Sequence, residues 1–170
     1  MNTNTMEAVK SPLDVPQTEQ IGQIPAREFY LFVCSGNTCR SPMAAALFNH
    51  YYGTDTRIAK SAGLFADGSP MSENASLALE QAGITPPEHI SRPVSEALIR
   101  QATQVIGITA AHADSLIWSC PHFASKITKL PIDIPDPFGG DLAVYQKCLE
   151  TIQSALFEMF GPPTEADNTI

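Results

Sequence analysis

Two residues with complementary chemistry, Cys34 and Arg40, stand six positions apart in the segment Cys-Ser-Gly-Asn-Thr-Cys-Arg. A cysteine thiolate is a nucleophile, and an arginine guanidinium donates paired hydrogen bonds to two oxygens of one phosphate. An apolar run at 29–33 precedes the segment and a helical pattern follows it, which predicts a loop between a buried strand and a helix. The end of such a strand and the start of a helix together favour a bound anion. The spacing therefore predicts an oxyanion site, for phosphate or a similar group, that contains a nucleophile.

The residues inside this segment suit a tightly curled loop. Gly36 adopts left-handed backbone conformations freely and Asn37 tolerates them, so several backbone N–H groups can point inward at the oxyanion. The positive field of these groups also favours a thiolate at Cys34. Ser41-Pro42 is typical of a helix start, with Ser41 as N-cap. The residues expected to bind the substrate are Ser35, Gly36, Asn37, Thr38, Cys39 and, from a later loop, Phe138.

A loop at 131–141 contains three aspartates, Asp133, Asp136 and Asp141, among three prolines and two glycines. Phosphate-ester cleavage needs one carboxyl group that protonates the leaving atom and then acts as base toward water. Any of the three can equally be a solvated loop carboxylate. The residue types alone leave the choice open.

Two other interpretations of Cys34 have less support. A lone buried cysteine is commonly a small core residue, but here an arginine, a loop glycine and a helix start accompany it. A zinc site usually has closely paired ligands, whereas no two of the four cysteines form a C-x-x-C pair and the four histidines are scattered. We therefore expect no metal and no other cofactor.

The rest of the sequence alternates strand and helix patterns. Apolar runs predict four strands, at 29–33, 58–61, 105–108 and 127–130. Helical patterns predict five helices, at 41–52, 72–82, 94–102, 111–118 and 142–160. This order predicts a single-domain α/β fold: a four-stranded parallel sheet with helices on both faces and the phosphate loop after the first strand.

Composition narrows the possible partners and location. The 170 residues are 44% apolar and carry a net charge of −8, which disfavours nucleic acid as a partner. No run approaches the roughly 20 apolar residues of a membrane helix, and no export signal is evident, so we expect a cytoplasmic protein with free thiols. Residues 1–27 predict a disordered extension, 28–161 the folded domain and 162–170 a flexible tail.

The stretch from Val33 to Met43 resembles the phosphate loop of the low-molecular-weight protein tyrosine phosphatases. The resemblance covers residues 28–160, and Ser61-Ala62-Gly63 and Asp136-Pro137 are similar to two further signatures of that family. It implies Cys34 as nucleophile, Arg40 as phosphate clamp and Asp136 as general acid. It also implies supporting roles: Ser41 for the thiolate, and Ser61 and His89 for Asn37. Asp133 is then structural, and Asp141 caps the last helix.

Within the family, Thr38 and the run Asp-Pro-Phe-Gly-Gly at 136–140 are similar to bacterial protein-arginine phosphatases, as is the stretch 61–70. The Thr38 hydroxyl can hydrogen-bond a polar guanidinium or an attacking water. Members that act on phosphotyrosine often have a larger aliphatic residue at this position. We therefore expect phosphoprotein substrates, with phosphoarginine favoured and phosphotyrosine as the alternative. More distant alternatives are an arsenate reductase and a non-catalytic phosphoprotein-binding module.

Overall fold

The computed structural model describes residues 27–164. The extension predicted over 1–27 therefore falls almost wholly outside the described residues, as does most of the tail predicted over 162–170, and both stay predictions. None of the helices within 27–164 is both long enough and apolar enough to cross a membrane.

Strands and helices alternate along the described chain. The strands are β1 (Glu28–Cys34), β2 (Arg57–Gly63), β3 (Gln104–Gly107) and β4 (Ile127–Lys129). The helices are α1 (Arg40–Tyr52), α2 (Glu73–Gln81), α3 (Glu96–Gln101), α4 (Ala110–Ser119), the short 3₁₀ helix η1 (Pro121–Lys126) and α5 (Leu142–Phe160). All four predicted strands and all five predicted helices are confirmed to within a few residues, whereas η1 was not predicted.

The four strands form one parallel sheet in the order β2-β1-β3-β4. Its central strand β1 pairs with β2 as far as Cys34 and Gly63, and with β3 as far as Val33 and Gly107. The carboxyl ends of three neighbouring strands therefore meet at one edge, which is where ligands bind in open α/β sheets. The predicted fold class is confirmed.

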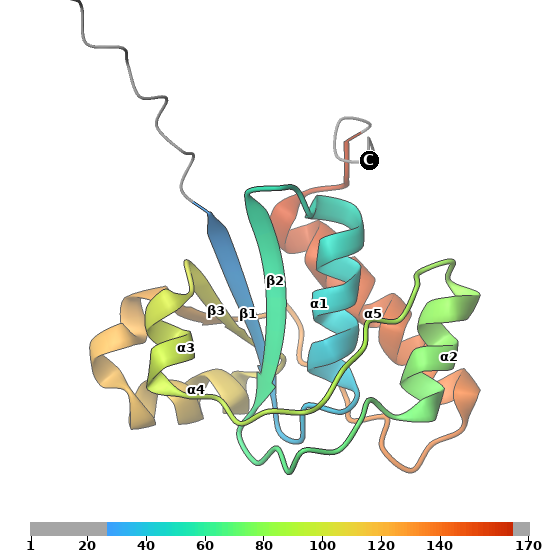
Figure 1. The fold of residues 1–170 in the computed structure, drawn as a ribbon, viewed down its shortest axis with the longest axis horizontal. Helices are drawn as coiled ribbons and strands as arrows, with labels where there is room; N and C mark the ends of the chain where they lie inside the picture. The colour runs from blue at the N-terminus through green and yellow to red at the C-terminus, as the bar shows by residue number, and fades with distance from the viewer. Residues whose placement is uncertain (1–26, 165–170) are drawn as a thin grey trace, which may run out of the picture.

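Helices cover both faces of this sheet, with α1, α2 and α5 on one face and α3 and α4 on the other (Figure 1). Successive side chains of β1 alternate between the faces, because a strand has a period of two. Phe32 packs into the cluster under α1 and α5, while Leu31 and Val33 pack into the cluster with α3 and α4. All three are fully buried, which explains why β1 is a continuous apolar run.

Helix starts agree with the sequence in two cases and differ in a third. The side chains of Ser72 and Asp141 accept hydrogen bonds from Ala75 N and Val144 N, so both are N-caps as predicted. Ser41, predicted as the N-cap of α1, is instead inside the helix, which begins at Arg40. Its hydroxyl is turned toward the end of β1, and this is the physical reason that it does not cap the helix.

Candidate active site

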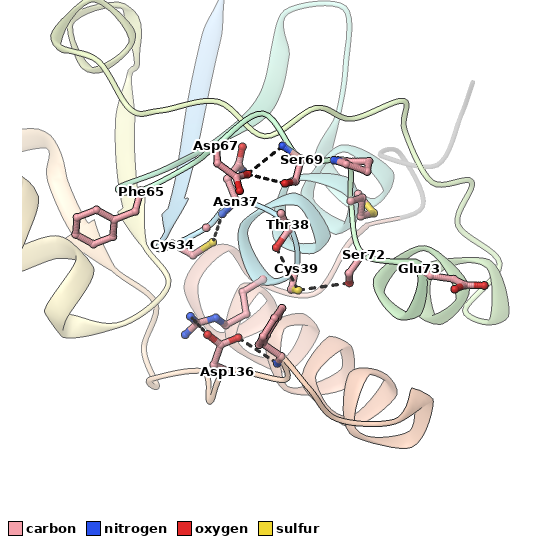
Figure 2. Close-up of a pocket in the computed structure, with 15 residues that line it drawn as sticks. Cys34, Asn37, Thr38, Cys39, Phe65, Asp67, Ser69, Ser72, Glu73 and Asp136 are labelled. Atoms are coloured by element: carbon pink, nitrogen blue, oxygen red, sulfur yellow. Dashed lines mark hydrogen bonds and ion pairs between the residues drawn. The ribbon is translucent and has the colours of Figure 1, made fainter.

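A pocket of about 800 Å³ opens where β1 ends and the loop 34–40 leads into α1. Figure 2 shows Cys34 between two sides of this pocket, with Asp136 on one side and Asp67 and Ser69 on the other. Five further members of the lining come from the phosphate loop itself: Gly36, Asn37, Thr38, Cys39 and Arg40. The structure thus brings together residues that are about 100 positions apart in the sequence.

The sulfur of Cys34 is buried and polar groups surround it. Its side chain is only 2% exposed, and its Sγ lies 3.0 Å from Ser41 Oγ. The backbone N–H of Asn37 also donates to this sulfur, at 3.3 Å. Both contacts suit a thiolate, which accepts hydrogen bonds and donates none. Ser41 therefore lies where a residue that supports the thiolate has to lie.

Asn37 carries the sharp bend of the loop. It has a φ of 58°, the only positive φ of a non-glycine residue among the described residues. Gly36, the other residue of the loop that allows a left-handed backbone, has no positive φ, so Asn37 alone takes this conformation within the loop. Asparagine tolerates the left-handed region better than most residues, and here its side chain holds it there.

Four hydrogen bonds fix Asn37 at this bend. Its amide nitrogen donates to Ser41 Oγ and to Ser61 Oγ, both at 2.9 Å, and its amide oxygen accepts from the backbone N–H of Arg92 at 3.0 Å. Its backbone oxygen accepts from His89 Nε2 at 2.7 Å. Ser61 and His89 thus both contact Asn37, as the family resemblance implies. The network ties the loop to β2 and to the segment that precedes α3.

Gly63, at the end of β2, allows β2 to approach the phosphate loop closely. A Cβ atom at this position would lie 2.6 Å from the backbone oxygen of Ser35 and 3.0 Å from the backbone nitrogen of Asn37. Both of these are backbone atoms of the loop, which cannot move aside without deforming it. The glycine of the Ser-Ala-Gly segment is therefore required by packing.

Arg40 links the phosphate loop, 34–40, to the acidic loop, 131–141, which contains the three aspartates. Its Nη1 donates to the backbone oxygen of Ile134 at 3.1 Å, and its Nη2 forms an ion pair with Asp136 Oδ2 at 2.8 Å. The Arg40 side chain is 8% exposed and that of Asp136 is 52% exposed. One face of the acidic loop is thus held at the pocket, with the carboxyl group still open to solvent.

The three aspartates of the acidic loop have different surroundings. Asp136 lines the pocket, whereas Asp133 accepts from the backbone N–H of Ala110 at 2.9 Å and lies 3.8 Å from Lys129 Nζ. Asp141 caps α5. Asp133 and Asp141 thus have structural partners, and Asp136 is the aspartate of this loop that lines the pocket with Cys34.

The remaining predicted site residues are divided between the pocket and its surroundings. Thr38 lines the pocket, and Phe138 lies at its rim with 79% of its surface exposed. The thiol of Cys39 is 4% exposed and packs 3.4 Å from both the Ser72 and the Tyr145 hydroxyls. Ser35 does not line the pocket, and its hydroxyl instead lies 3.0 Å from His112 Nε2.

A family model described as low molecular weight phosphotyrosine protein phosphatase matches residues 30–167. The chain belongs to this family. The protein-arginine-phosphatase of Geobacillus stearothermophilus is 37% identical over 134 residues, which cover 74% of this chain and 89% of that protein. The solved structure of the YwlE arginine phosphatase from that organism has a TM-score of 0.73 and 36% identity, covering 78% of this chain and 90% of that one.

A solved mutant of YwlE carries a phosphorylated active-site serine. It has a TM-score of 0.70 and 31% identity to this phosphatase, and the match covers 77% of this chain and 92% of that one.

Sequence reasoning missed several residues of this phosphatase that contact the loop or line the pocket. They are Phe65, Asp67, Arg92, His112 and Tyr145. His112 could have been found from the spacing Thr109-x-x-His112, because a threonine followed three residues later by a hydrogen-bonding side chain is a capping-box pattern. Phe65 and Asp67 fall within the stretch 61–70 that resembles arginine phosphatases, whereas Arg92 and Tyr145 come from other segments and carry no local signal.

Within residues 27–164 the side chains of His, Cys, Asp and Glu form no group of three or more that could hold a metal ion. The four cysteines of this phosphatase are free thiols. The thiols and charged groups that line the pocket are the Cys34 and Cys39 thiols, the Arg40 guanidinium and the carboxyl groups of Asp67, Glu73 and Asp136.

Proposed function

We propose that this phosphatase removes the phosphoryl group from phosphoarginine side chains of proteins, with Cys34, Arg40 and Asp136 as its catalytic residues and 28–161 as its catalytic domain. The observation that carries the substrate choice is the 37% identity to a protein-arginine-phosphatase over 89% of that protein's length. The polar wall that Thr38 gives to the pocket supports it.

In the first step, the Cys34 thiolate attacks phosphorus and the bond between phosphorus and the guanidino nitrogen breaks. Asp136, protonated, gives its proton to that nitrogen, and arginine leaves. The backbone amides of the loop and Arg40 bind the three phosphoryl oxygens and stabilise their negative charge. The product is a phosphocysteine, and the phosphorylated active-site serine of the related YwlE mutant supports such an intermediate.

In the second step, Asp136 is a carboxylate and acts as base. It takes a proton from a water molecule, whose oxygen attacks phosphorus while the sulfur–phosphorus bond breaks. Phosphate leaves, and the Cys34 thiolate and protonated Asp136 are restored. The 52% exposure of the Asp136 side chain suits this role, because water has to reach it.

Phosphotyrosine is a second candidate substrate, and the aromatic rim of the pocket favours it. Phe65 and Phe138 line the pocket and are 81% and 79% exposed. Exposed rings at a pocket mouth can stack on a phenol ring. They can equally stack on a planar guanidinium group, so this observation does not outweigh the relationship to arginine phosphatases.

The more distant alternatives have weaker support. An arsenate reductase relays oxidation through further cysteines, but burial raises the pKa of the Cys148 thiol to about 12, which leaves it a poor attacking group. A non-catalytic phosphoprotein-binding module has no use for a nucleophile and a carboxyl group at the same pocket. The free thiols agree with a reducing compartment, and we propose the cytoplasm.

Turnover of two peptides of the same sequence, one with phosphoarginine and one with phosphotyrosine, tests the proposal. We expect kcat/KM for phosphoarginine to be higher by about tenfold or more, the scale of discrimination that one hydrogen-bonding contact provides. A higher value for phosphotyrosine would overturn the substrate choice and leave the phosphatase chemistry intact.

A further inference from the structure

His112 is a buried histidine outside the pocket that contacts the phosphate loop. It lies in the first turn of α4, is 5% exposed, and its Nε2 is 3.0 Å from the hydroxyl of Ser35. Ser35 directly follows the nucleophile in sequence. The mechanism above gives His112 no role, although it is the only residue of α4, within the described part of the chain, whose side chain hydrogen-bonds to the phosphate loop.

The hydrogen bonds of the ring define its protonation. The backbone N–H of Thr109 donates to His112 Nδ1 at 3.1 Å, as part of a capping box in which Thr109 Oγ1 also accepts from the backbone N–H of His112. A nitrogen that accepts a hydrogen bond carries no proton. The single proton of the neutral ring is therefore on Nε2, where it is donated to Ser35 Oγ.

The peptide group between Ser35 and Gly36 is held by contacts on the side that faces away from the pocket. The backbone oxygen of Ser35 accepts from the backbone N–H of Phe65 at 2.9 Å, and the Ser35 side chain is held by His112. In a trans peptide, the N–H group points opposite to the C=O group. With the Ser35 oxygen directed outward, the N–H of Gly36 points inward, and Gly36 lines the pocket.

We propose that His112 is a positioning residue, whose neutral Nε2–H form holds the Ser35–Gly36 peptide so that its N–H faces the bound phosphoryl group. The proposal rests on the phosphatase function only for its kinetic consequences, because oxyanion binding can be measured without turnover. A second proton on His112 would sit on Nδ1, opposite the backbone N–H of Thr109, which would then lose its acceptor. The acceptor for the new proton would be Thr109 Oγ1, 2.9 Å away, so the reciprocal capping box would be broken and the ring would lose one of the contacts that fix it.

The charges around His112 set the pH range of this effect. Burial, followed by the nearby Arg40 guanidinium, lowers the pKa of His112 below its usual value, while Asp136 and Asp133 oppose this shift. A lowered pKa in the folded state means that the neutral ring stabilises the fold above the unfolded-state pKa, and that this stabilisation is lost as pH falls. Oxyanion affinity should therefore decrease on the acid side.

The test uses the full chain and four variants: His112→Asn, His112→Gln, Ser35→Ala and the Ser35→Ala/His112→Asn double variant. Asparagine offers an acceptor near the position of Nδ1 but does not reach Ser35. Glutamine reaches Ser35 with a donor that has no proton to gain. The readouts are inorganic vanadate affinity by calorimetry and kcat/KM for p-nitrophenyl phosphate, both measured between about pH 5 and 8, the range in which histidine usually changes charge. Thermal unfolding is the third readout.

We expect His112→Asn and Ser35→Ala each to weaken vanadate binding about five- to tenfold at neutral pH, the value of one hydrogen bond. The double variant should lose no more than either single variant, because both remove the same contact. His112→Gln should recover most of the affinity and keep it at acid pH, where wild-type affinity falls.

Additive losses in the double variant, or the same acid-side decline in wild type and His112→Gln, would overturn the proposal. A lower unfolding temperature with unchanged vanadate affinity would show a purely structural role. If His112→Asn does not fold, Ser35→Ala and His112→Gln still decide the matter. Strong vanadate binding by a wild-type protein without phosphatase activity would contradict the proposed function and leave the positioning role standing.

Discussion

Two of the three segments that line the pocket, the phosphate loop and the acidic loop, are built in opposite ways. Most of the phosphate loop, 34–40, is buried, and both polar atoms of the Asn37 side chain have partners. The acidic loop, 131–141, leaves Asp136 half exposed and Phe138 almost fully exposed, and is attached to the pocket through Arg40. Binding a phosphoryl group requires fixed donors, whereas proton transfer requires a carboxyl group that water and different leaving groups can reach.

The largest effect should come from the centre of the buried loop. Cys34→Ser should lower kcat on the order of 10⁴-fold or more, since the covalent route loses its nucleophile. The fold and vanadate binding should persist, because the change is nearly isosteric at a site 2% exposed. In the wild-type protein, mass spectrometry after incubation with substrate should detect a phosphoryl group on Cys34. Activity within about tenfold of wild type would exclude Cys34 as the nucleophile.

The exposed loop should show an effect that depends on the leaving group. Asp136→Ala and Asp136→Asn should slow phosphoarginine turnover about 100- to 10,000-fold, the usual contribution of a general acid. p-Nitrophenyl phosphate should be affected far less, because its leaving anion needs little protonation. The Asn variant keeps a hydrogen-bond acceptor for Arg40, so it separates proton transfer from positioning. Asp133→Ala is the matched control, and a larger effect there would show that the wrong carboxylate was chosen.

The features that the sequence predicts best are those formed by residues close to one another along the chain. The parallel sheet and the order of strands and helices follow from local apolar patterns, because each buried element records its burial in its own residues. Cys34 and Arg40 are visible for the same reason, since one loop contains both. The structure adds what depends on three-dimensional approach: the contacts of Asn37 with Ser61, His89 and Arg92 join segments 24 to 55 residues apart.

Two residues near the loop differ from what general propensities favour. A serine before a proline favours a helix cap, and a glycine favours the left-handed region more than an asparagine does. In the structure Ser41 contacts the sulfur of Cys34 and Asn37 takes the bend, because the loop has to surround that sulfur with polar groups. Local rules are overridden where a site imposes its own geometry.

Gly63 and Gly36 differ in how closely other atoms approach the position of a Cβ, so replacing each by alanine tests the packing of the phosphate loop. Gly63→Ala should lower stability by about 1–3 kcal/mol, because its methyl group would meet loop backbone atoms. The deformed loop should lower kcat/KM by about tenfold to a hundredfold, the rate equivalent of that energy. Gly36→Ala is the control: a Cβ there has one neighbour within 4 Å, Thr38 Oγ1 at 3.7 Å. Equal loss of stability in both variants, measured by urea unfolding, would contradict the close-packing account.

The smallest and most specific effect should come from Thr38, where the fixed loop meets the substrate. Thr38→Ile removes a hydroxyl and adds apolar bulk at a position that lines the pocket. A phosphoarginine substrate loses a polar partner, while the ring of phosphotyrosine gains an apolar contact. Each change is worth about 1–3 kcal/mol, so the ratio of the two kcat/KM values should shift toward phosphotyrosine by about tenfold or more.

Folding should change little in Thr38→Ile, because the bend of the loop rests on Asn37 and its four hydrogen bonds rather than on Thr38. The unfolding temperature is therefore the control for the kinetic comparison. If the ratio of the two kcat/KM values stays constant in a folded variant, the residues that determine substrate selectivity lie in the acidic loop rather than in the phosphate loop. Phe138 would then be the residue to replace, because it lines the same pocket from the acidic loop.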